Sequence, residues 1–382
     1  MAISYTTSRD VAEWFRVTGM SIELRCPETG LGLREMSLAE AEQVVGPLHS
    51  RPGVIFGRTD RVLLREDHAA AYPVVDGVPI LMTPEVLTVD PREIDFEDGR
   101  WAEAYDEIEY YNQAAGDAAK SIHQIAETLA HLVPEEAWSP AWLDAPYDAA
   151  AQWEALCYVG PPSRKAVLQI GGKGAHAVRA LLGGATEVWL VTPMISEAQF
   201  ALKLMERMGV ADRFHAVVGI AEQIPLGDRS FDAIYSGGSL HHMDAAHAGP
   251  EINRVLKPGG RFAAVEPWQT ILHKYGTRLV GKREKDVYCR PLNRDRLALM
   301  RGPFGHFTVS QHAPLLRYLA LAWLKVSKRS IEPTTGLRLT RYDDMLPLPR
   351  RWGGSVAVLA ERSDASHRGA VAPSIGRAAL PG

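Results

Sequence analysis

The sequence predicts an α/β protein with a doubly wound, mostly parallel sheet, preceded by a small β-rich N-terminal module and a helical connector. The first observation is that, from Lys165 onward, short apolar runs typical of buried strands alternate with longer segments typical of helices. The second is a glycine-rich turn that directly follows the first of these runs. The third is that the runs before residue 90 are shorter and broken by Pro and Gly, which favours a separate small sheet.

Composition excludes several classes of protein. The chain has 382 residues, of which 46% are hydrophobic and 23% charged, with a formal net charge of -4, and this indicates a globular protein with ample core. It contains no run of about 18 apolar residues and no signal-peptide pattern at its start, so we expect no membrane partner. No long basic run is interleaved with aromatic residues, so we also expect no nucleic-acid partner.

Cysteine and histidine usage favours a reducing, cytoplasmic location and no metal centre. The three cysteines, Cys26, Cys157 and Cys289, are odd in number and far apart, which argues against a disulfide framework. Neighbouring histidines such as His241 and His242 do not have the spacing of a metal-binding pattern on a helix. We therefore expect no metal ligands in this chain.

Helices are expected at residues 1–20 and in the connector at residues 91–160. In the first segment, Ser8 is a suitable cap, apolar residues follow on one face, and Gly19 is a suitable stop. The connector is rich in tryptophan and tyrosine, and its first part is acidic. Its aromatic residues either pack between domains or form a lid over an apolar or planar substrate, and the sequence leaves both interpretations open.

The β-rich module is expected at residues 21–90 and ends in a hairpin. The stretch from Tyr72 to Met82 reads as two strands joined by the turn dipeptide Asp76-Gly77. The segments LRCPETG and YPVVDGVPILM resemble Trm112-like zinc-ribbon modules, which occur beside or fused to methyltransferases. Where that family places a second cysteine, this chain has Thr29, so we expect a metal-free module held by its core.

Residues 161–362 are expected to form the α/β domain, followed by a disordered tail at residues 363–382 that is rich in Ala, Gly, Ser and Pro. Glycines end the first two predicted helices, as is common at helix C-termini. In order, the predicted elements are the strand KAVLQIG, a helix from Ala175 to Leu182, the strand EVWLVT, a helix from Ser196 to Met208, the strands RFHAVVG and FDAIYSG, a helix from Gly249 to Leu256, and the strand RFAAVEP. The closing elements are a strand from Phe307 to His312, a helix near Leu315 to Val326, and the strand SVAVLAE.

Three motifs in sequence carry a family resemblance. The glycine turn VLQIGGKGAHA is followed by AEQIPLGDRSFDAIYSGGSLHHM and then by EINRVLKPGGRFAAVEPW. In this order and spacing they resemble the class I S-adenosylmethionine-dependent methyltransferases, in particular the small-molecule branch of that family. The resemblance runs from about Lys165 to Arg301. It implies S-adenosylmethionine as cofactor and a small molecule as substrate.

The resemblance also implies a set of cofactor-binding residues, with three acidic positions replaced. The family's acids correspond here to Gln169, Thr192 and Ile220, and Lys173 replaces the middle glycine of the turn. Loss of the ribose and adenine carboxylates would remove about 3 to 6 kcal/mol, or about two to four orders of magnitude in affinity. We expect Glu222 to compensate in part, and Thr192→Asp to tighten binding. The expected cofactor-binding residues are Gln169, Gly171, Gly172, Gly174, Thr192, Ala221, Glu222 and Ser236.

The candidate catalytic residues are His241 and His242, which follow the fourth predicted parallel strand, and Glu266 at the end of the fifth. A histidine has an unperturbed pKa near neutrality and can remove a proton, although packing beside the cofactor is an equally simple interpretation. Trp268 is expected to border the acceptor. A basic segment then follows, and its residues Arg278, Lys282, Arg283 and Arg290 would favour an acceptor with phosphate or carboxylate groups.

The sequence therefore favours an enzyme that transfers methyl from S-adenosylmethionine to a small anionic or aromatic metabolite. Because a fold does not dictate an activity, two other hypotheses stay open. In one, the chain has lost the use of S-adenosylmethionine and is an enzyme of another type, such as a lyase, cyclase or hydrolase. In the other, it is a non-catalytic binding or scaffold protein.

Overall fold

The computed structural model describes residues 22–48, 61–82, 126, 139–270, 291–327 and 331–363. Several expectations concern residues outside these ranges and are not addressed by the fold. They are the helix at residues 1–20, the connector at residues 91–138 apart from Ala126, Cys289, the tail at residues 364–382, and the basic residues Arg278, Lys282, Arg283 and Arg290.

The N-terminal module is an antiparallel sheet in which β1 (Leu33–Ser37), β2 (Arg61–Arg65), β3 (Ala71–Val75) and β4 (Val78–Pro79) follow one another in order. Helix α2 (Leu38–Val45) begins at a capping box formed by Ser37 and Glu40. Asp76 and Gly77 have φ values of 49° and 79°, as a two-residue turn with two left-handed positions requires. Val75 pairs with Val78, which confirms the hairpin predicted from the sequence.

Cys26 lies buried in this module and contacts protein side chains. Its Sγ is 3.1 Å from the hydroxyl oxygen of Tyr72 and 3.7 Å from Nη1 of Arg65. Burial by itself raises the pKa of the Cys26 thiol, but hydrogen bonds from Thr29, Tyr72 and Arg65 outweigh it and lower that pKa. Within the described ranges, no group of three or more His, Cys, Asp or Glu residues is arranged to hold a metal ion.

The second sheet has seven strands and is mostly parallel, which confirms the predicted doubly wound α/β architecture. The strand order is β10-β11-β9-β8-β5-β6-β7, with β10 and β11 antiparallel to their neighbours. Because the chain moves outward from β5 in both directions, the order reverses between β5 and β8, where this fold class binds ligands. The strands are β5 (Ala166–Ile170), β6 (Glu187–Thr192), β7 (Phe214–Val218), β8 (Phe231–Gly237), β9 (Leu256–Pro267), β10 (His306–His312) and β11 (Ser355–Glu361).

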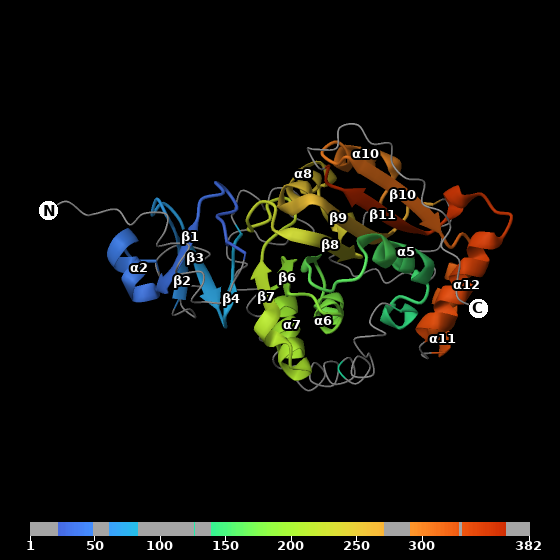
Figure 1. The fold of residues 1–382 in the computed structure, drawn as a ribbon, viewed down its shortest axis with the longest axis horizontal. Helices are drawn as coiled ribbons and strands as arrows, with labels where there is room; N and C mark the ends of the chain where they lie inside the picture. Colours follow the sequence, from blue (N-terminus) through green and yellow to red (C-terminus); the bar gives the residue numbers. More distant parts are fainter. Residues whose placement is uncertain are drawn as a thin grey trace.

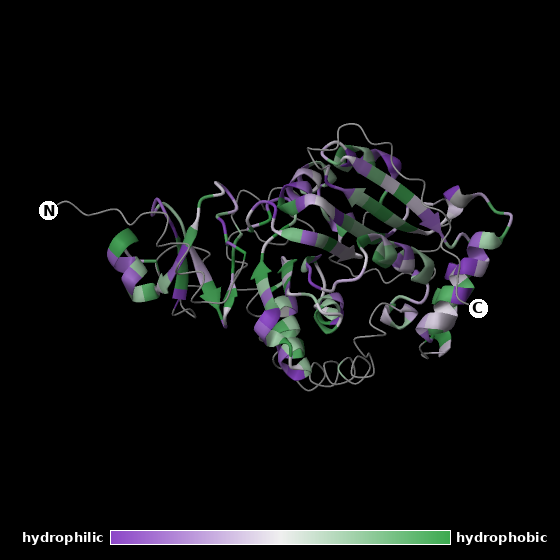
Figure 2. Cartoon of the chain, in the orientation of Figure 1, coloured by the Kyte–Doolittle hydropathy of each residue, from purple (hydrophilic) through white to green (hydrophobic). Residues whose placement is uncertain are grey.

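Helices cover both faces of this sheet (Figure 1). Alternating strand residues divide the core: Val167 and Val188 pack with the helices α5, α6 and α7, whereas Leu168 and Trp189 pack with α8 and α10. Apolar residues accordingly run along the strands, while the helices carry both hydrophobic and hydrophilic residues (Figure 2). These helices are α5 (Ala149–Val159), α6 (Ala175–Leu182), α7 (Ile195–Met208), α8 (Ala245–Val255) and α10 (Arg294–Arg301). The short helices are η4 (Pro140–Trp142), η5 (Ala211–Arg213), η6 (Leu240–His242) and η7 (Arg350–Trp352).

Two more helices, α11 (Leu316–Ser327) and α12 (Pro333–Met345), lie at the end of the molecule opposite the N-terminal module (Figure 1). The sequence pattern predicts α11 but not α12. The carboxylate of Asp343 in α12 accepts hydrogen bonds from the backbone N–H groups of Leu315 and Arg317, which fixes the start of α11. No helix within the described parts of the chain is long and apolar enough to cross a membrane.

A partly buried charge cluster links α5, β10 and α12. Nδ1 of His312 lies 2.6 Å from Oδ2 of Asp344, and its Nε2 lies 2.6 Å from Oε2 of Glu154. Burial lowers the pKa of His312, but the two carboxylates outweigh it and raise that pKa to about 9. His312 is therefore charged at neutral pH, and the ion pairs link three elements that are distant in sequence.

The N-terminal module packs against the loop that joins β7 to β8. This loop, residues 219–230, contains no helix, and Ile22 and Leu24 of the module belong to the same core cluster as Ile234 of β8. Main-chain hydrogen bonds join the two parts: Leu81 N–H donates to Val218 O over 2.8 Å, Arg25 N–H to Pro225 O over 3.0 Å, and Gly227 N–H to Glu23 O over 2.9 Å. The module therefore forms main-chain hydrogen bonds near both ends of this loop.

Candidate cofactor and active site

A cavity of about 360 Å³ lies at the carboxyl ends of β5, β6, β7 and β8. Its position is the point where the strand order reverses, and its volume is within the range of small-molecule sites. The glycine turn after β5, the start of α7, the loop after β7 and the segment after β8 all contribute to it. The lining residues are Ile170, Gly171, Gly172, Val191, Pro193, Met194, Glu197, Gly219, Ile220, Ala221, Glu222, Gly237, Gly238, Ser239, His242 and Met243.

The turn after β5 requires glycine for conformation and for space. Gly171, Gly172 and Gly174 all have φ between 73° and 80°, a region that other residues rarely adopt. A Cβ atom at Gly171 would meet the side chain of Ser239, with the two Cβ atoms 2.6 Å apart. A Cβ atom at Gly174 would lie 2.7 Å from that of Ala201, so this glycine serves the packing of α6 on α7 and does not line the cavity.

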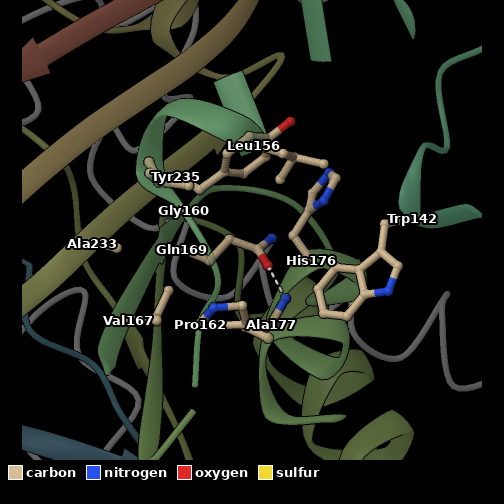
Figure 3. Close-up of a pocket in the computed structure, with 12 residues that line it drawn as sticks. Trp142, Leu156, Gly160, Pro162, Val167, Gln169, His176, Ala177, Ala233 and Tyr235 are labelled. Carbon is tan, nitrogen blue, oxygen red and sulfur yellow. Dashed lines mark hydrogen bonds between the residues drawn. The ribbon is translucent and has the colours of Figure 1, made fainter. Parts of the chain in front are cut away.

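Gln169 stabilises the turn through two hydrogen bonds and does not line the large cavity. Its Nε2 donates to Gly171 O over 2.7 Å, and its Oε1 accepts from Ala177 N–H over 2.7 Å, as Figure 3 shows for the second bond. It lines a smaller cavity of about 40 Å³, together with Trp142, His176 and other residues of α5, α6 and β8 (Figure 3). Both polar ends of this side chain therefore fix the turn and the start of α6.

A carboxylate faces the large cavity next to the end of β6, although the strand itself ends in Thr192. The Thr192 hydroxyl is buried and donates to Oε2 of Glu197 over 2.6 Å, while it accepts from Met194 N–H over 3.3 Å. Glu197 lines the cavity and belongs to the first turn of α7, where the helix dipole favours a negative charge. Glu197 is not among the site residues predicted from the sequence, where its only signal is its place as an acid in the first turn of a predicted helix.

A second carboxylate, that of Glu222, enters the cavity from the loop after β7. Its side chain is buried, and its Oε1 accepts a hydrogen bond from Asp244 N–H over 2.7 Å. Burial raises the pKa of Glu222. Ile220 and Ala221 beside it give the cavity an apolar wall. Among the described residues that line the cavity, none is Lys or Arg, and this lining suits a ligand that carries positive charge and hydrogen-bond donors.

The three candidate catalytic residues lie together, but only His242 lines the cavity. Glu266 is buried beneath η6 and accepts from the backbone N–H groups of Ser239 over 2.9 Å and Leu240 over 2.7 Å. Its Oε2 also lies 2.6 Å from Nδ1 of His241, whose ring centroid is 4.0 Å from that of His242. The carboxylate therefore holds η6 in place, and η6 places His242 in the cavity wall.

His242 is neutral at physiological pH. Burial, together with the neighbouring charges of His241 and Arg296, lowers its pKa to about 4. A neutral imidazole has one nitrogen that can accept a hydrogen bond or a proton. It also avoids the repulsion that an imidazolium would exert on a cationic ligand.

Two further predicted residues lie outside the lining of the cavity. Ser236 in β8 is buried, and its Oγ has no hydrogen-bond partner within the described parts of the chain. Trp268 is buried just after β9, where it pairs with Leu292 in a parallel bridge. Ala221 and Glu222, by contrast, are placed in the cavity wall together with Gly171 and Gly172.

Comparison with known proteins agrees with the position of this cavity. Residues 168–264 match the family model described as a methyltransferase domain. An uncharacterised methyltransferase of Mycobacterium tuberculosis is 35% identical over 163 residues, which are 42% of this chain and 60% of that protein. The ubiquinone/menaquinone biosynthesis C-methyltransferase of Methylobacterium nodulans is 39% identical over 99 residues, which are 25% of this chain and 39% of that protein. The chain thus spans about 60% or less of the length of these relatives.

Among solved structures, geranyl diphosphate C-methyltransferase from Streptomyces coelicolor is 20% identical, with a TM-score of 0.43 over 56% of this chain and 78% of that one. The segment that matches the family model contains the glycine turn, the loop after β7 and the segment after β8, and these three form most of the cavity wall. Residues 168–264 of this chain are therefore similar to the methyltransferase domain family, and they contribute most of the residues that line the cavity.

Proposed function

We propose that this protein transfers a methyl group from S-adenosylmethionine to a small acceptor molecule. The observation that carries the proposal is the cavity at the reversal of strand order, which combines the glycine turn with two carboxylates inside the segment that matches the methyltransferase domain. The matched segments cover only 60% and 39% of the two relatives, so the proposed activity rests on the site and on its chemistry.

The residues of the cavity fit the proposed cofactor. Glu197 and Glu222 would accept hydrogen bonds from its hydroxyl and ammonium groups, and the apolar wall at Ile220 and Met243 would contact its base. Because the turn consists of glycines, the cofactor could approach its backbone closely, which a side chain there would prevent. In this interpretation, Glu197 takes the place of the acid that the family carries at the end of the second strand. S-adenosylmethionine would supply an electrophilic methyl group on a positively charged sulfur.

The chain itself contributes alignment, charge and exclusion of water. Glu197 is the negative group beside a cationic ligand, Glu222 is a hydrogen-bond acceptor whose pKa burial raises, and neutral His242 adds no opposing charge. A pKa of about 4 makes His242 a weak base, so we expect alignment of the acceptor to contribute more than proton removal. Glu266 and His241 act through η6 as positioning residues for His242.

For the acceptor, we propose a small anionic or aromatic molecule. The sequence from His273 to Arg301 has nine Lys or Arg residues against three acids, and it follows β9 at the ligand-binding edge of the sheet. The names of two relatives, a ubiquinone/menaquinone biosynthesis C-methyltransferase and a 27-O-demethylrifamycin SV methyltransferase, also favour a small organic acceptor.

Calorimetric titration of the full chain with S-adenosylmethionine and S-adenosylhomocysteine tests the proposal. We expect saturable binding of both, weakened about ten- to a hundredfold by Glu197→Gln, because a hydrogen bond to a charged group contributes about 1.5 to 3 kcal/mol. Glu206→Gln is the matched control, since Glu206 lies exposed on the same helix. Absence of binding at millimolar ligand would refute the proposed cofactor and favour another enzyme class or a scaffold.

A further inference from the structure

Exposed apolar side chains are concentrated in one part of the molecule. Within the described residues, eleven large hydrophobic side chains are exposed, and eight of them lie between residues 315 and 352. Scattered single residues of this kind are normal on a protein surface, but a cluster indicates an interaction site. We name this cluster the α11–α12 surface, and its residues are Leu315, Leu319, Trp323, Val326, Tyr342, Met345, Leu346 and Trp352.

The helical spacing arranges these residues in stripes. Leu315, Leu319 and Trp323 are four residues apart, so they follow one another along one face of α11, and Val326 falls on the same face. Their exposed fractions are 44%, 60%, 56% and 83%. The helix α12 packs beside α11, and hydrophilic and hydrophobic residues alternate on this pair in Figure 2. Both helices therefore present apolar side chains outward at the end of the molecule.

The same segment carries a strong excess of positive charge. Residues 315–352 contain eight Lys or Arg residues and three acids, Glu332, Asp343 and Asp344. Asp343 is buried and Asp344 is paired with His312, while among the basic residues Arg317 is buried and paired with Asp148. Seven Lys or Arg residues of the segment then stand against Glu332. A helical surface that combines exposed Leu and Trp with Lys and Arg is typical of proteins that lie in the interface of an anionic membrane.

We propose that the α11–α12 surface binds the face of an anionic lipid bilayer. The apolar stripe of α11 would lie among the lipid headgroups, and the basic residues would contact their phosphates. A second copy of this chain is a poorer partner, because a symmetric dimer through this surface would bring two positively charged segments together. The proposal differs from the expectation of no membrane partner, which rested on the absence of a spanning segment, and it does not depend on the proposed methyl transfer.

Flotation of the full chain with lipid vesicles tests this proposal. We expect binding to vesicles of phosphatidylcholine mixed with phosphatidylglycerol, and much weaker binding to phosphatidylcholine alone or at high salt. The double variant Leu319→Ser/Trp323→Ser should lose at least about tenfold in binding, because its side chains no longer enter the interface. Val44→Ser/Leu299→Ser is the matched control, since these residues are 51% and 61% exposed elsewhere on the protein.

A second pair of substitutions tests the charge separately. Each Lys or Arg near an anionic surface contributes about 1 kcal/mol, so Arg338→Gln/Arg341→Gln should weaken binding about 25-fold. The proposal is overturned if no binding to the anionic vesicles occurs, or if neutral vesicles bind equally well. It is also overturned if sedimentation velocity shows a dimer that Leu319→Ser/Trp323→Ser dissociates, because the surface would then be an interface between copies of this chain.

Discussion

Because Thr192 and Glu197 are in contact, two substitutions can exchange the positions of the carboxylate and its hydrogen-bond donor beside the cofactor cavity. In the native protein the Thr192 hydroxyl donates to Glu197, so a single carboxylate faces the cavity at this position. Thr192→Asp alone would place a second carboxylate beside the first with no donor between them. The double variant Thr192→Asp/Glu197→Gln would instead keep one carboxylate and one donor, with their positions exchanged.

The magnitudes follow from the 2.6 Å separation between the Thr192 and Glu197 oxygens. Two like charges about 4 Å apart at an effective dielectric constant of about 20 repel by about 4 kcal/mol. This corresponds to about 3 pKa units, so one of the two carboxyl groups in Thr192→Asp would be about half protonated at neutral pH. Contrary to the expectation from the sequence alone, we predict that Thr192→Asp does not tighten binding. Glu197→Gln should weaken binding about ten- to a hundredfold, and the double variant should recover most of this loss.

The assay is a double-mutant cycle of four proteins, each titrated calorimetrically with S-adenosylhomocysteine and S-adenosylmethionine. The native protein and the double variant should bind with similar affinity, and the two single variants more weakly. Thermal unfolding of each variant serves as the control for folding. If Thr192→Asp binds more tightly than the native protein, or if Glu197→Gln binds equally well, Glu197 does not hold the ligand and the reasoning is refuted.

Three further predictions concern other parts of the structure. The pKa of His312 is raised from about 6.5 to about 9, so its ion pairs should stabilise the fold by up to about 3 kcal/mol below pH 6.5, and this should be lost as the pH rises through 9. Denaturant unfolding of the native protein and of His312→Gln at pH 6 and pH 10 measures it, and an equal difference at both pH values would contradict it. Gly171→Ala should lower the melting temperature and weaken cofactor binding, because the new Cβ would meet Ser239 and φ is 73°, and Ser239→Gly should restore part of the loss. Because the partners of Cys26 are protein side chains, a zinc chelator should leave the melting temperature unchanged, and a clear decrease would show that a metal stabilises the module.

Much of the fold could be predicted because local signals agree with the tertiary structure. The helix Ala175–Leu182 and the strand Glu187–Thr192 have the predicted bounds, since glycines and an uninterrupted apolar run mark them. The helix α12 was missed because its buried positions include Gly336 and Thr340 and so do not form an apolar stripe. Its partners in α5 lie about 190 residues away, as the hydrogen bond from Ala150 N–H to the Thr340 hydroxyl shows.

The candidate site could be predicted less completely, because the direction of a side chain depends on contacts across the fold. Gly171 and Gly172 were predicted from the turn and line the cavity. Glu197 depends on the buried hydroxyl of Thr192, and no sequence pattern indicates that contact. Glu266 lies at the end of β9, a common place for a catalytic acid, but the backbone of η6, about 26 residues earlier, provides its partners. The roles of the site residues remain predictions for the experiments above.

The attachment of the N-terminal module to residues 218–227 couples the packing of this module thermodynamically to ligand binding in the cavity. The same short loop that lines the cavity with Ile220 and Glu222 is bonded on its outer side to Glu23, Arg25 and Leu81. Any ligand that orders this loop must then also strengthen its attachment to the module, and the coupling free energy is the same in both directions. A shortened chain without the first ninety residues should accordingly lose ligand affinity, even though none of the removed side chains that the structure describes, in residues 22–48 and 61–82, lines the cavity.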